Sequence, residues 1–99
     1  MDDLAAFLNA RLDEDESRWR DLADLGEQGY WDFMLAEVDA KRRIIAKLEH
    51  YRQRADEPCT REEGIMYDDH VDALTAVVQL LALPYANHPD YRPEWRPNE

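Results

Sequence analysis

The chain has 99 residues, with 23 acidic and 12 basic side chains that give it a net charge of −11. Its length predicts one small domain, residues 1–99, and its 44% hydrophobic content is enough for a folded chain. The negative charge disfavours direct nucleic-acid binding, because that binding depends on lysine and arginine contacts to phosphates.

Residues 2–25 have the period of an amphipathic helix. Apolar side chains recur three, four or seven positions apart, and Asp2 and Asp3 suit the N-terminal end, where the helix dipole favours negative charge. Asp15 interrupts the apolar stripe, so we expect the middle of this face to be hydrated or locally bent. The stripe consists of Leu4, Leu8, Leu12, Trp19 and Leu22.

Residues 30–55 predict a second helix, with six basic and four acidic side chains. Glu37 precedes Lys41 by four positions, a spacing that pairs opposite charges along a helix. Such pairing explains the basic run 41–43 better than nucleic-acid binding does. The apolar stripe of this helix consists of Trp31, Leu35, Val38, Ile45 and Leu48.

Residues 56–67 have no helical period and predict a loop. A third helix is expected at 69–83, with Asp68 or Asp69 as its N-terminal cap and Pro84 at its end. Because it is apolar nearly all round, we expect it to be the most buried element. Its core face should consist of Val71, Leu74, Val77 or Val78, and Leu81.

The tail, residues 84–99, carries prolines four positions apart, which excludes a helix interior and predicts an extended, partly polyproline-like segment. Large aromatic side chains lie between the prolines, and we expect them to pack on the helices. The predicted fold is therefore all-α, a three-helix bundle with an extended proline-rich aromatic tail packed across it.

Acidic side chains gather in two places, the run Asp13–Glu16 and residues 56–72, which together form a candidate negative surface. Such a surface steers a partner of opposite charge. Trp19, Trp31 and Trp95 are the candidate aromatic anchors wherever they are exposed. We therefore expect a non-enzymatic protein that binds another protein with a basic surface. The candidate interaction residues are Asp13, Glu14, Asp15, Glu16, Trp19, Glu62, Glu63, Asp68, Asp69 and Trp95.

Three alternatives stay open at this point. The first is an acidic inhibitor that occupies the nucleic-acid groove of a basic host or defence protein. The second is a metal-binding protein that uses His70 and Asp72, although no short cysteine or histidine spacing supports a structural zinc site. The third is a homodimer formed through the apolar third helix.

The sequence supports neither catalysis nor a cofactor. Cys59 lies in an acidic segment that disfavours the reactive thiolate, and the three glycines form no phosphate-binding loop. Cys59 is also the single cysteine, which excludes an internal disulfide and fits a reducing compartment. With neither an apolar run of membrane-spanning length nor a secretory signal, a cytoplasmic location is expected.

Three blocks, in residues 1–16, 36–48 and 80–97, resemble a family of small proteins encoded by actinomycetes and their phages, a domain of unknown function. The most specific block runs Leu80-Leu81-Ala82-Leu83-Pro84-Tyr85-Ala86-Asn87-His88-Pro89-Asp90-Tyr91 and ends in Trp95-Arg96-Pro97. The resemblance implies a setting, a bacterial cytoplasm during phage infection or on a mobile element. It implies no activity.

Overall fold

Three helices account for most of the computed structural model, which describes residues 3–26 and 28–97. Helix α1 spans Asp3–Ala23, α2 spans Gln28–Asp56 and α3 spans Arg61–Ala82. Single 3₁₀ turns follow at Leu83–Tyr85 and Pro93–Trp95. The all-α, three-helix prediction is confirmed. The expected helix start at residue 2 and tail residues 98–99 lie outside the described residues.

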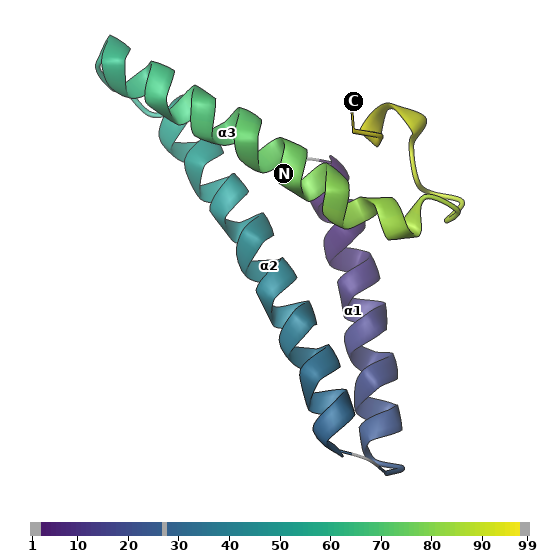
Figure 1. Cartoon of the computed structure of the whole chain (residues 1–99). Helices are drawn as coiled ribbons and strands as arrows, with labels where there is room; N and C mark the ends of the chain where they lie inside the picture. The colour runs from purple at the N-terminus through teal and green to yellow at the C-terminus, as the bar shows by residue number, and fades with distance from the viewer. Residues whose placement is uncertain (1–2, 27, 98–99) are drawn as a thin grey trace.

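The helices form an open triangle (Figure 1). Helices α1 and α2 make an antiparallel hairpin that widens away from its turn, and α3 returns from the end of α2 across the N-terminal half of α1. The radius of gyration is 15.9 Å, whereas a compact domain of this length has about 13 Å. Much of each helix therefore faces solvent.

The third helix begins eight residues earlier than predicted, and the loop predicted at 56–67 is wrong. Only a short link separates α2 from α3, and the Thr60 side chain caps α3 by accepting a hydrogen bond of 3.1 Å from the Glu63 backbone N–H. A threonine followed three residues later by glutamate is a known signal for a helix start. Here that signal outweighs the lack of an apolar period in residues 61–68.

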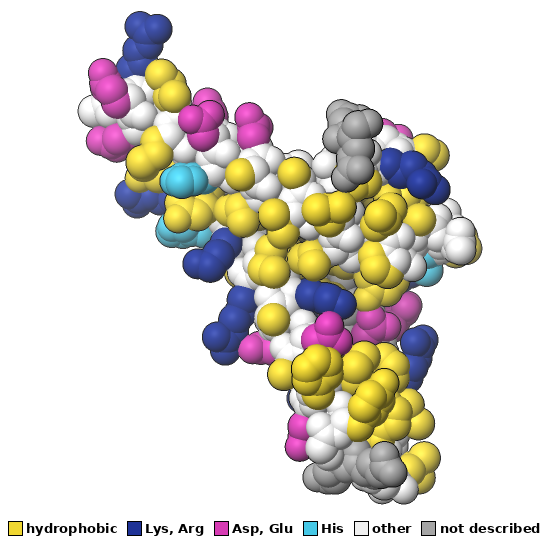
Figure 2. Space-filling model, viewed as in Figure 1, with side chains coloured by type: hydrophobic (Ala, Val, Ile, Leu, Met, Phe, Trp, Pro, Cys, Tyr) yellow, Lys and Arg dark blue, Asp and Glu magenta, His cyan; other side chains and the backbone are white. Residues whose placement is uncertain are grey.

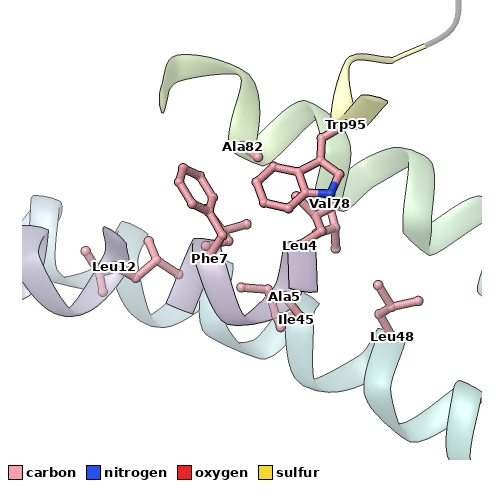
Figure 3. Close-up of a cluster of buried hydrophobic side chains, with 11 residues drawn as sticks. Leu4, Ala5, Phe7, Leu12, Ile45, Leu48, Val78, Ala82 and Trp95 are labelled. Carbon is pink, nitrogen blue, oxygen red and sulfur yellow. The ribbon is translucent and has the colours of Figure 1, made fainter. Parts of the chain in front are cut away.

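The core lies where the N-terminal half of α1, the middle of α2, the C-terminal half of α3 and the tail meet (Figure 3). Among the described residues, α1 supplies five of the eleven buried hydrophobic side chains and α3 only two, Val78 and Ala82. The expectation that α3 is the most buried element is therefore wrong. Two neighbouring helices and a short tail cannot surround a helix of 22 residues, so its outer side stays exposed.

The expected core face of α3 is otherwise close to the observed one. Val71, Leu74 and Leu81 are partly buried against the core, and Val78 is fully buried. Val77, the alternative to Val78, is 39% exposed.

Aromatic rings fix the tail to α1 around the Phe7 ring. The ring centroids of Trp95, His88, Tyr91 and Tyr85 lie 5.1, 5.5, 5.9 and 6.5 Å from that of Phe7. Trp95 also lies against Leu4 and Val78 in the core (Figure 3). The prediction that the tail aromatics pack on the helices is confirmed.

The predicted extended tail is only partly correct. Arg92 and Arg96 have extended backbone angles, but the two 3₁₀ turns each begin near a proline, Pro84 and Pro93. Proline fits the first position of such a turn, because its fixed φ suits the turn and its missing N–H would have no partner there. The turns let the chain fold back so that Trp95 reaches the core.

The side chain of Asp15, which interrupts the apolar stripe of α1, binds the tail. Its carboxylate accepts a hydrogen bond from the Tyr85 hydroxyl across 70 positions of sequence. Burial, helped by this bond to a carboxylate, raises the pKa of Tyr85 well above its ordinary value of 10. The polar interruption in α1 is thus an anchor for the tail.

We expect Tyr85→Phe to lower the free energy of unfolding by about 1 kcal/mol, the usual value of one hydrogen bond. In the wild-type protein the unfolded Tyr85 releases its proton near pH 10 while the folded one keeps it. Stability should therefore fall as pH rises above 10, and the difference between wild type and variant should shrink. Urea denaturation at neutral and alkaline pH measures the stability difference and its change with pH. Equal stability of wild type and Tyr85→Phe at neutral pH would show that this hydrogen bond does not hold the tail.

Candidate interaction surfaces

The acidic run Asp13–Glu16 is largely paired within the molecule. Arg42 of α2 donates from Nη1 to Glu16 Oε1 at 2.8 Å and from Nη2 to Asp13. Arg20 pairs with the other Glu16 oxygen at 2.9 Å. The Arg42 guanidinium, followed by Arg20, lowers the pKa of Glu16, and Glu16 in turn raises that of Arg42. This cluster ties the two arms of the hairpin together.

The other two acids of the run also have partners. Glu14 lies 3.3 Å from the Arg11 guanidinium, and Asp15 binds Tyr85 and lies 3.9 Å from Arg18. The run therefore offers a partner protein less free charge than its sequence implies.

Replacing Arg42 with glutamine should destabilise the protein at neutral pH, because it leaves Glu16 and Asp13 without their partner from α2. The folded Glu16 has a lowered pKa, so its contribution is complete above the ordinary value of 4.5 and is lost as pH falls below it. We expect the difference in urea midpoint between wild type and Arg42→Gln to be largest near pH 7 and smallest in acid.

Arg43→Gln is the matched control, since Arg43 pairs with Asp39 within α2 and both side chains are mostly exposed. It should shift the midpoint less than Arg42→Gln does. Equal shifts in the two variants would rule out a special role for the link between α1 and α2.

The other predicted acids form an exposed group on α3. Glu62, Glu63, Asp68 and Asp69 lie in its N-terminal half, and in the described part of the chain none of them forms an ion pair. Asp72 is exposed in the next turn. The negative surface expected from the sequence is thus concentrated at one end of α3.

The three tryptophans have different environments. Trp95 is 9% exposed and belongs to the core, so it is not available as an anchor for a partner. Trp19 and Trp31 are partly exposed and stack across the hairpin, with ring centroids 5.5 Å apart and planes 18° from parallel. The stack gives the hairpin a rigid aromatic surface.

Large apolar side chains are also exposed near the hairpin turn. Leu25 is 83% exposed, Phe33 63% and Tyr30 56%. A hollow of about 230 Å³ lies beside them, lined by Leu22, Leu25, Gly26 and Trp31. Figure 2 shows hydrophobic side chains gathered over this end of the molecule. We call Leu22, Leu25, Tyr30, Trp31 and Phe33 the hairpin patch.

The sequence held a signal for the hairpin patch. On a helix with 100° per residue, Tyr30 and Phe33 fall well away from the stripe that Trp31, Leu35 and Val38 form. Large aromatics off the core stripe favour an exposed aromatic surface. The aromatic anchors expected from the sequence are the tryptophans alone, so Tyr30 and Phe33 are not among them.

A second apolar surface lies on the outer side of α3 and is visible along that helix in Figure 2. Its large side chains are between 38% and 55% exposed. The α3 stripe consists of Ile65, Met66, Ala73, Ala76, Val77, Leu80 and Leu83. Two of its members, Ile65 and Met66, fall in the segment that the sequence predicted to be a loop.

The structure offers the metal hypothesis little support. The His70 ring packs on Tyr51, with centroids 4.8 Å apart, and residues 3–26 and 28–97 contain no group of three or more histidine, cysteine, aspartate or glutamate side chains placed to hold an ion. His88 accepts a hydrogen bond of 3.0 Å from the Asp90 backbone N–H, which stabilises a turn.

A hollow of about 520 Å³ on α2 is lined by Arg43, Ala46, Lys47, His50 and Tyr51.

Fold and surface together define a small all-α protein with exposed apolar patches. A family model described as "Family of unknown function (DUF6221)" matches residues 1–97, and the chain belongs to that family. No curated protein and no solved structure matches it. In the described part of the chain, no helix combines the length and hydrophobicity needed to cross a bilayer.

Proposed function

We propose that this protein is a non-enzymatic interaction module that docks its hairpin patch onto an apolar surface of another protein. The observation that carries the proposal is the exposure of Leu25, Tyr30 and Phe33, each more than half accessible, beside a hollow at one end of the molecule. Monomeric proteins rarely leave large contiguous apolar surfaces uncovered, and such surfaces commonly mark binding sites.

The composition of the patch suits a binding site. Aromatic side chains dominate the energetics of protein interfaces, and the Trp19–Trp31 stack holds the surrounding surface in place before a partner arrives. Exposed acids, Asp21, Asp24 and Asp32, lie close to the patch in sequence. A partner with a basic rim around an apolar centre fits this arrangement, and the charge of −11 speeds its approach.

The inhibitor hypothesis rests on fewer residues than the sequence suggested. Because Asp13–Glu16 pair internally, the acids of α3 would have to supply most of the resemblance to phosphates. Those acids alternate with apolar side chains, a composition better suited to protein contact. The actinobacterial or phage origin that the C-terminal motif implies, and the cytoplasmic location, fit an interaction protein but stay predictions.

Phe33→Glu tests the proposal. The substitution places a charge in the hairpin patch, so a partner captured from the source organism by the wild-type protein should be lost or bound at least about 30-fold more weakly. Titration with the recovered partner measures the change. Gln53→Glu is the matched control, since it adds the same charge at another exposed position of α2.

Binding that survives Phe33→Glu, or that Gln53→Glu reduces as strongly, would show that the hairpin patch is not the docking site. Circular dichroism of both variants checks the fold. Both positions are exposed, so the helix content should equal that of the wild type.

A further inference from the structure

The α3 stripe has the spacing of a helix-pairing surface. Met66, Ala73 and Leu80 are seven residues apart, and Ala76 and Leu83 repeat the same interval three positions later. This is the a/d pattern by which two helices pack side by side. The stripe runs from Ile65 to Leu83, about 27 Å at 1.5 Å per residue, and lies on the side of α3 opposite the buried Val78 and Ala82.

Side-chain size along the stripe favours a symmetric contact. The two alanines, Ala73 and Ala76, lie at its centre, where small side chains allow the closest approach of two helix backbones. Most of the larger side chains lie toward its two ends, Ile65 and Met66 before the centre and Leu80 and Leu83 after it, and Val77 follows the central alanines. An antiparallel pair of α3 helices therefore places the large side chains of one copy against those of the other.

Charge decides between the two orientations of such a pair. Four of the five exposed acids of α3 lie in its N-terminal half, with Asp72 at its middle, and Asp69 lies within the stripe itself. A parallel pair would bring these acids, and the two Asp69 carboxylates, against each other, which is unfavourable. An antiparallel pair keeps the four acids of the N-terminal half apart.

The C-terminal end of the stripe lies beside a basic side chain, Arg96 of the tail. A hollow of about 260 Å³ is lined by Leu80, Leu83, Arg96 and Pro97, and Arg96 is exposed there. In an antiparallel pair this hollow faces the N-terminal end of the partner's helix, where Glu62 continues the same side of α3 one turn before Met66. Arg96 of each copy then meets acidic side chains of the other.

We propose that two copies of this chain form an antiparallel, two-fold symmetric dimer through the α3 stripe. Each copy contributes the same surface, as a two-fold contact requires. The hairpin patch lies at the opposite end of the molecule from α3 (Figure 1), so the dimer presents two free hairpin patches. The dimer does not depend on the proposed function, because the two surfaces share no residue.

Light scattering and sedimentation over a concentration series test the dimer. The wild-type protein should approach twice 11.7 kDa as its concentration rises. Leu80→Glu should raise the dimer dissociation constant about 100-fold or more, because the symmetry places two charges in the contact. Phe33→Glu, an equal charge on the hairpin patch, should leave the dimer unchanged.

Disulfide formation between single introduced cysteines tests the orientation of the two α3 helices. Each variant also carries Cys59→Ser, which removes the native thiol. Near the two-fold axis, Ala73→Cys should link two copies readily. Met66→Cys should not, because its symmetry mate lies at the far end of the contact.

Three results would overturn the dimer as proposed. A mass of 11.7 kDa at the highest soluble concentration excludes it, and loss of the dimer in Phe33→Glu but not in Leu80→Glu places the contact on the hairpin patch. If Met66→Cys forms the disulfide between copies faster than Ala73→Cys does, the two α3 helices are parallel. None of these results changes the expected loss of partner binding in Phe33→Glu.

Discussion

The packing of tail aromatics around Phe7 holds this fold together. Three helices of this length in an open triangle bury too few side chains to close a core, and the tail supplies the missing apolar surface through Trp95. The ring of Phe7 contacts four aromatic side chains of the tail, and Arg92 adds an ion pair of 2.9 Å to Asp3 at the start of α1. Trp95 is therefore part of the core, and the tail aromatics around it pack against the core.

This arrangement decides which surfaces remain free. The tail packs on α1 and on the C-terminal half of α3, where Arg96 and Pro97 also border Leu80 and Leu83, whereas the hairpin turn and the rest of the outer side of α3 lie beyond it. Both uncovered regions carry large apolar side chains, such as Phe33 and Leu80. A chain whose stability is already supplied elsewhere can keep such side chains exposed for binding, and this is why we assign them to interaction rather than to an incomplete core.

The acidic residues have two different uses. Three acids of the run Asp13–Glu16 are structural, because Arg42 bridges Glu16 and Asp13 and thereby joins α1 to α2, and Asp15 holds Tyr85 of the tail. Among the described residues, the acids at the N-terminal end of α3 form no such ion pair, although Glu63 helps to raise the pKa of Arg54, and that end of the helix stays negative. Net charge alone cannot separate the two uses, since each acid counts equally in the total of −11.

The sequence by itself determined the three helices, the end of α3 near Pro84 and the aromatic tail packed on them, because apolar period and proline act locally. The start of α3 at Thr60 is also encoded locally, in a capping signal that outweighs the missing apolar period of residues 61–68. Tertiary structure alone decided that Trp95 is buried, that Asp15 meets Tyr85 and that Val77 faces outward. These outcomes depend on the angle at which α3 crosses the hairpin, which sets what covers each helix face, and no local pattern encodes that angle.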